Sequence, residues 1–142
     1  FNKLIEKYNN TDSLLEQNQI LSALGTTTDL TIINYLLNAT FDLDNSLNLK
    51  VRTQDIPRVV SATSHNFKAR DLTWNFVKNN WDVIYDKLSK GSFLFGRVVS
   101  GPTSLMSSEK DYKEIKEFLE GKNIKTLEKT VQQILEKIKN NF

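Results

Sequence analysis

Apolar residues recur at helical spacing along most of this chain, and the pattern is strongest in residues 70–88. The apolar positions of that stretch, which include both tryptophans, are Trp74, Val77, Trp81, Ile84, Tyr85 and Leu88. At about 3.6 residues per turn they form one stripe along a single helix, which Leu72 and Phe76 widen. We therefore predict one long helix, surrounded by its neighbours. Its predicted core residues are Trp74, Phe76, Val77, Trp81, Ile84 and Leu88.

Seven further segments show the same periodicity, at about residues 1–8, 13–24, 29–37, 54–65, 93–100, 109–119 and 127–142. The residues that fit N-caps before these helices are Asp12, Thr28 or Asp29, Thr53, Ser92, and Ser107 with Ser108. Gly25 fits a left-handed helix end, and Gly101 with Pro102 is expected to end the helix that begins near residue 93. No segment alternates with period two for long enough to predict a strand. The sequence thus predicts an all-α fold of about eight helices in antiparallel succession.

The length and composition are those of an ordinary globular domain. The chain has 142 residues, of which 39% are hydrophobic and 25% charged, and it contains no cysteine. No run approaches the roughly 18 apolar residues that a membrane span needs, so we expect no span. Because the chain starts at Phe1 rather than at a methionine, we expect a piece of something longer or a processed product.

Basic residues gather mildly in the middle of the chain. Residues 49–106 hold nine basic groups against four acidic ones, but the net charge of +2 is too small to indicate a nucleic-acid partner. The polar positions of most interest are Arg52, Gln54, Asp55, Arg58 and Arg70. They are candidates for contacts with a substrate cavity or another domain, because clustered arginines bind carboxylates well. The alternative is structural, with Asp55 paired to an arginine that joins two hairpins.

Residues for catalysis or metal binding are missing from the sequence. A zinc peptidase needs two histidines one turn apart and a glutamate, as in H-E-x-x-H, whereas His65 is the only histidine here. A lone histidine near a helix end is more often a cap or a surface residue than a ligand. The two tryptophans could stack on bases, but an apolar helical stripe favours a core role. We predict no catalytic and no metal-binding residue in this chain.

Several short strings carry a resemblance to a known family. They are A-L-G at residues 23–25, Y-L-L at 35–37, V-R-T-Q-D-I-P at 51–57, W-N-F-V-K-N-N-W at 74–81 and G-S-F at 91–93. In this order and spacing, from about residue 14 to the end, the chain resembles the C-terminal helical domain of zinc aminopeptidases. The types it resembles are aminopeptidase N, puromycin-sensitive aminopeptidase and the tricorn-interacting factors.

The resemblance implies a right-handed α-solenoid of antiparallel helix hairpins, similar to HEAT or armadillo repeats. No fixed repeat period is visible in the sequence, so this prediction depends partly on the resemblance. Residues 1–142 would form a single domain, the C-terminal part of the helical domain of a larger aminopeptidase. That domain would pack on the catalytic domain of the same polypeptide and enclose the cavity for peptide substrates.

The parent enzyme would remove N-terminal amino acids from peptides, with its zinc held in the catalytic domain outside this chain. We expect a cytoplasmic compartment, with a secreted or membrane-anchored parent as the alternative. The alternative function, from a different class, is a free-standing helical-repeat adaptor that binds a protein partner.

Overall fold

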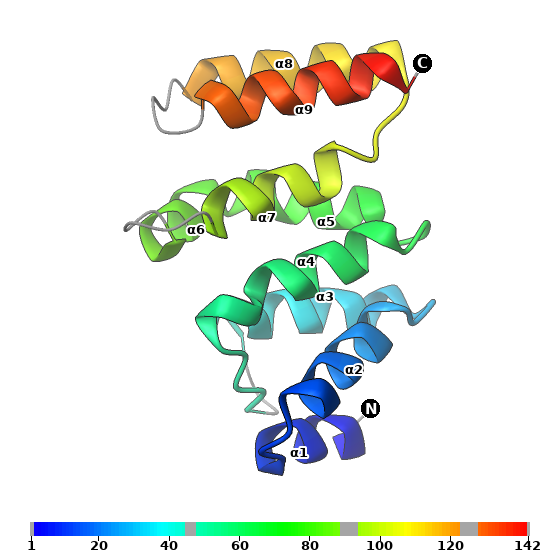
Figure 1. Ribbon diagram of the computed structural model, residues 1–142, viewed down its shortest axis with the longest axis vertical. Helices are drawn as coiled ribbons and strands as arrows, with labels where there is room; N and C mark the ends of the chain where they lie inside the picture. Colours follow the sequence, from blue (N-terminus) through cyan, green and yellow to red (C-terminus); the bar gives the residue numbers. More distant parts are fainter. Residues whose placement is uncertain (1, 45–47, 89–93, 123–127, 142) are drawn as a thin grey trace.

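The computed structural model describes residues 2–44, 48–88, 94–122 and 128–141, and in these ranges it is all-α, as predicted (Figure 1). The described ranges contain nine α-helices, one 3₁₀ helix and no strand. The elements are α1 (Asn2–Asn10), α2 (Leu14–Gly25), α3 (Leu30–Thr40), η1 (Thr53–Asp55), α4 (Ile56–His65), α5 (Arg70–Asn79), α6 (Trp81–Leu88), α7 (Leu94–Thr103), α8 (Glu109–Lys122) and α9 (Glu128–Asn140). Four positions or strings used above lie outside the described residues, namely Phe1, 91–93, Leu127 and Phe142.

The helices are stacked along the long axis of the molecule and follow one another from the N-terminus to the C-terminus (Figure 1). They form two rows. In one row α2 contacts α4, α4 contacts α7 and α7 contacts α9. In the other row α3 contacts α5, α6 follows α5, and aromatic contacts join both α5 and α6 to α8. Successive parts of the chain therefore alternate between the rows.

The prediction of one long helix over residues 70–88 is wrong, because the chain breaks at Asn80 into α5 and α6. Asn80 has φ −117° and ψ 24°, outside the helical region. Its side-chain amide donates to the Phe76 carbonyl at 2.9 Å, where its own backbone N–H also donates at 3.1 Å. Asparagine competes with the helix in this way because its short side chain reaches nearby backbone groups. Past the break Tyr85 is 37% exposed, although the single-helix prediction placed it in the stripe.

Two predicted N-caps are confirmed. The Asp29 carboxylate accepts a hydrogen bond from the Thr31 N–H at 2.9 Å at the start of α3. The Ser108 hydroxyl accepts one from the Asp111 N–H at 3.0 Å before α8. Both side chains satisfy first-turn amides that have no partner within their helix.

Two other predicted N-caps are wrong. At α2 the cap is Ser13 rather than Asp12, since the Ser13 hydroxyl accepts from the Glu16 N–H at 3.3 Å. Thr53 begins the 3₁₀ turn η1, and α4 starts without a side-chain cap. Pro57 stands in the first turn of α4, where its missing N–H costs little.

The predicted helix end at Gly25 is correct in position but not in its left-handed conformation, and the predicted end at Gly101 and Pro102 is wrong. Gly25 is the last residue of α2, and no positive φ is recorded there. A Cβ at Gly25 would lie 2.6 Å from the Ala62 Cβ, so glycine serves a close approach of α2 to α4. Gly101 and Pro102 lie inside α7, which runs to Thr103. Pro102 is the second-last residue of α7, so the hydrogen bond that its missing N–H would have made belongs to the last turn of the helix.

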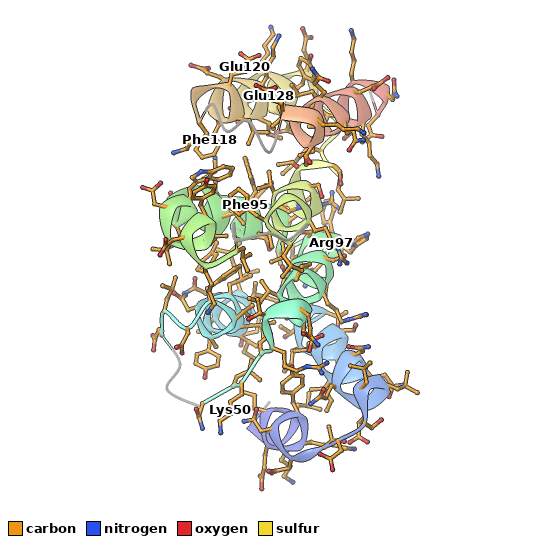
Figure 2. All side chains as sticks on the ribbon, turned by 60° about the vertical axis from the view of Figure 1, so that its left-hand side comes forward. Lys50, Phe95, Arg97, Phe118, Glu120 and Glu128 are labelled. Carbon is orange, nitrogen blue, oxygen red and sulfur yellow. The ribbon has the colours of Figure 1, made fainter. Side chains whose placement is uncertain are left out.

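The buried apolar residues form two clusters, and in the larger one Trp81 contacts rings from two other helices. Its ring meets Phe95 of α7 edge to face at 5.0 Å and Phe118 of α8 at 5.3 Å. Phe118 also contacts Trp74 of α5 at 5.6 Å, and Figure 2 shows Phe118 extending from α8 toward the layer below. The six residues Trp74, Phe76, Val77, Trp81, Ile84 and Leu88 are all at most 8% exposed. Large aromatic side chains therefore join the four helices α5, α6, α7 and α8.

Candidate functional site

The polar residues singled out by the sequence are arranged first around Asp55, at the start of α4. Asp55 is only 6% exposed. Its Oδ2 atom lies 2.8 Å from Nε of Arg52, which forms a salt bridge within the turn η1. The same oxygen accepts a hydrogen bond from the Tyr8 hydroxyl of α1 at 3.3 Å. The carboxylate thus joins η1 to α1 over 47 residues of sequence.

The pKa values of Tyr8 and Arg52 are both shifted in this contact. Tyr8 is 1% exposed, and burial raises the pKa of its phenol above the ordinary value of 10.0, with the negative charge of Asp55 adding to the effect. The hydrogen bond to Asp55 raises the pKa of Arg52. The buried Nη2 atom of Arg52 has no hydrogen-bond partner among the described residues. Arg52 is therefore engaged mainly in a local ion pair.

The remaining members of the polar set lie apart from this group. Gln54 and Arg58 are exposed. Arg70 donates from Nε to the Ser64 carbonyl at 2.9 Å, at the opposite end of α4 from Asp55. With a rise of about 1.5 Å per residue, the two ends of α4 are roughly 14 Å apart. The five residues thus do not form one cluster.

His65 lies exposed at the last position of α4. Its Nδ1 atom is 2.8 Å from the Ser61 carbonyl one turn back, a contact typical of a helix end. Among the described residues, no group of three or more His, Cys, Asp or Glu side chains is placed to hold a metal ion.

A second polar site, which the sequence reasoning missed, is a pocket of about 250 Å³ between α3 and α5. Its lining residues, five of them asparagines, are Asn34, Asn38, Leu72, Asn75, Phe76, Asn79 and Asn80. A signal was present in the sequence, since Asn34 and Asn38, and likewise Asn75 and Asn79, are spaced four apart on predicted helices. The sequence did not predict that α3 and α5 lie side by side.

The fold defines a class of protein, an all-helical module in the residues that the structure describes. More specifically, the chain belongs to the family of ERAP1-like C-terminal domains, whose family model matches residues 1–140. This confirms the resemblance seen in the sequence. The chain is thus of the type that forms the non-catalytic C-terminal domain in enzymes similar to aminopeptidase N and the endoplasmic reticulum aminopeptidases.

The curated relatives that the chain resembles are all much longer. Endoplasmic reticulum aminopeptidase 2 of Bos taurus is 34% identical over 84% of this chain and 12% of its own length. Aminopeptidase N of Mus musculus is 27% identical over 96% of this chain and 14% of its own. Endoplasmic reticulum aminopeptidase 1 of Homo sapiens is 28% identical over 95% and 14%. The chain therefore spans about an eighth of the length of these relatives.

None of the helices in the described ranges is both long enough and apolar enough to cross a membrane.

Proposed function

We propose that this chain serves a zinc-dependent aminopeptidase as its C-terminal helical domain, packed on the catalytic domain of the same polypeptide and enclosing the peptide cavity. The observation that carries the proposal is the family match over residues 1–140, together with relatives that are named as aminopeptidases. The parent would remove N-terminal amino acids from peptides. The zinc ligands and the general base would come from an H-E-x-x-H helix outside this chain.

We also propose that residues 1–142 form one domain, a right-handed α-solenoid of helix hairpins. The two rows support this, because α2, α4, α7 and α9 stack on one side while α3, α5 and α8 stack on the other. A solenoid presents a long concave surface, which suits a wall around a peptide. The cytoplasmic compartment stays a prediction, and the names of several relatives, which mention the endoplasmic reticulum or an ectoenzyme, favour a secretory compartment instead.

Within such a cavity the candidate peptide contacts are the exposed Arg58 and the partly buried Arg70. Arg52 and Asp55 are weaker candidates because their opposite charges already compensate each other at 2.8 Å, whereas Arg70 donates only to an uncharged backbone carbonyl. The cationic side chains would receive the C-terminal carboxylate of a peptide whose amino end lies at the zinc.

The test uses the full-length parent enzyme with Arg58→Glu and Arg70→Glu made separately. At whichever arginine faces the cavity, reversal should raise KM for a ten-residue peptide about fivefold, the equivalent of roughly 1 kcal/mol for a partly exposed charge pair. KM for a single-residue fluorogenic substrate should not change, since that substrate is too short to reach the helical domain. Equal changes for both substrates, or no change at either arginine, would contradict the proposal.

The coding sequence upstream of this chain distinguishes the aminopeptidase domain from the alternative, a free-standing adaptor. An H-E-x-x-H sequence encoded upstream in the same frame supports the aminopeptidase. An initiator codon directly before Phe1 would favour the adaptor.

A further inference from the structure

The pocket between α3 and α5 is lined mostly by one type of side chain, the asparagine amide. None of its seven lining residues carries a charge, and five of them are asparagines. The two remaining lining residues, Leu72 and Phe76, are apolar. Phe76, only 8% exposed, lies against Phe41 with ring centroids 5.7 Å apart, and Leu72 is half-buried beside it. A neutral ligand with many hydrogen-bonding groups matches these walls better than an ion does.

The amide groups are free to bind. Asn34, Asn75 and Asn79 are exposed, and within the described ranges their side chains form no hydrogen bond. Asn38 and Asn80 each use the side-chain nitrogen on the backbone carbonyl four residues earlier, at 2.8 and 2.9 Å. Each free primary amide offers two donors and one acceptor. The pocket therefore presents donors and acceptors together on both of its walls.

The spacing of these amides matches an extended polypeptide. Asn34 and Asn38 are one turn apart on α3, and Asn75 and Asn79 are one turn apart on α5. Four residues of helix advance about 6 Å along the axis. In an extended chain, groups that face the same side recur every two residues, or about 6.6 Å. Successive amides on one helix can therefore meet successive peptide groups of a chain that lies along the pocket.

We propose that this pocket binds the main chain of an extended peptide, with asparagine Nδ2 atoms donating to its carbonyls and Oδ1 atoms accepting from its N–H groups. The volume of about 250 Å³ is below the roughly 300–1,000 Å³ typical of sites for drug-sized ligands, so a short piece of chain fits. Such binding is independent of the peptide's side chains and suits substrates of varied sequence. The identification of this peptide as a substrate in the cavity of the parent enzyme rests on the proposed function.

The pocket also identifies which row of helices faces the peptide. It lies on the row of α3 and α5, and Arg70 is the first residue of α5. Arg58 belongs to α4, in the other row. The kinetic effect in the parent should therefore be larger for Arg70→Glu than for Arg58→Glu.

The test is a titration of the ¹⁵N-labelled 142-residue chain, followed by the side-chain amide signals of its asparagines. The probe is acetyl-tetra-alanine amide, which has main-chain groups, no charge and only methyl side chains. Its matched control is the same peptide with N-methylated peptide bonds, which lacks the donors. A chitin tetrasaccharide tests the other neutral, hydrogen-bonding class of ligand. We expect the signals of Asn34, Asn75 and Asn79 to move with the first probe alone.

The double variant Asn75→Ala with Asn79→Ala should bind the probe about tenfold more weakly, since two hydrogen bonds of roughly 0.7 kcal/mol are lost. Asn140→Ala, an exposed asparagine on α9, should bind as the unchanged chain does. Three results would overturn the proposal: no shift of the pocket amides, equal shifts with the N-methylated peptide, or shifts with the sugar alone. Binding by the isolated chain with no kinetic effect in the parent would overturn the cavity role while leaving the pocket intact.

Discussion

At the scale of single residues, the best-defined polar contact is the buried carboxylate of Asp55 with Arg52 and Tyr8. The charged oxygen is compensated by a guanidinium and a phenol, so its burial is tolerated. The Arg52 pair closes the local turn η1, whereas the Tyr8 hydroxyl reaches across from α1. The contact to Tyr8 is therefore the one that bears on tertiary stability.

Replacement of Tyr8 by phenylalanine tests this contact. Tyr8→Phe keeps the ring in the core and removes the hydroxyl, so the free energy of unfolding should fall by about 1 kcal/mol. The bond is long at 3.3 Å, which argues against the larger values typical of charged partners. Urea unfolding at pH 7 measures the change. Tyr85→Phe, at a ring that is 37% exposed, is the control and should have almost no effect.

The raised pKa of Tyr8 makes the same contact sensitive to alkaline pH. Because the folded state holds the phenolic proton more tightly than the unfolded state, the stabilisation is fully present below pH 10.0 and is lost as pH rises through the higher folded pKa. The difference in stability between the unchanged chain and Tyr8→Phe should therefore stay constant up to about pH 10 and shrink above it. A difference that grew above pH 10 would contradict the assignment.

At the scale of elements, the close crossing of α2 and α4 depends on Gly25. A Cβ there would meet the Ala62 Cβ at 2.6 Å and two backbone atoms at 3.2 and 3.3 Å. The turns beside these helices are tied as well, since the Asn66 amide donates to the carbonyls of Gly25 and Thr27 at 3.0 and 2.7 Å. The backbone of α4 cannot move away without loss of these bonds.

Gly25→Ala should therefore lower the free energy of unfolding by about 1–3 kcal/mol, the usual cost of overpacking. Gly121→Ala is the matched control, because a Cβ at Gly121 in α8 would meet nothing within 4 Å. There the change should stabilise the chain by up to about 1 kcal/mol, as alanine favours helix over glycine. Thermal and urea unfolding of both variants give the comparison. Two changes of the same sign would show that helix propensity, rather than contact with Ala62, governs Gly25.

At the scale of the whole molecule, Trp81 joins the last pair of helices to the rest. Its contacts with Phe95 and Phe118 connect α6 to α7 and to α8. Lys122 of α8 also places its ammonium group over the Trp81 ring at 5.7 Å from the centroid. Loss of this ring should destabilise α8 and α9, at the top of Figure 1, more than α1 and α2 at the bottom.

Trp81→Ala should cost about 3–5 kcal/mol, the usual range for removal of a large buried aromatic. Amide hydrogen exchange should rise most in α8 and α9 and least in α1 and α2, because the latter belong to a separate core cluster. Phe67→Ala, at a side chain that is 86% exposed, should change stability by less than about 0.5 kcal/mol. Uniform exchange over all helices after Trp81→Ala would mean that the molecule unfolds as one cooperative unit.

Local patterns predicted much of the fold. The helical periodicity of the chain indicated the all-α class, and the caps at Asp29 and Ser108 were predicted correctly. The errors share one cause, since the uninterrupted stripe over residues 70–88, the left-handed conformation of Gly25 and the helix end at Gly101 were each inferred from the local sequence. At Asn80 and Gly25 a contact outside that pattern, with a carbonyl four residues back or with another helix, decides the conformation.

The candidate site divides in the same way. The sequence suggested that Asp55 pairs with an arginine, and the structure identifies that arginine as Arg52, three residues earlier in the same turn. It did not identify Tyr8 as a partner of Asp55, because 47 residues separate them and no local pattern encodes that distance. The spacing of the asparagine pairs on α3 and α5 is present in the sequence, but the pocket between them depends on the contact of the two helices, which the sequence did not predict.

By itself the sequence determined where most helices form, which faces they bury and which family the chain resembles. These properties follow from local hydrogen bonding and from the spacing of apolar side chains. Only the tertiary structure decided which helices are neighbours, and with that the carboxylate contact of Tyr8, the crossing at Gly25 and the pocket between α3 and α5. Such contacts depend on the packing of distant segments, which helical periodicity does not specify.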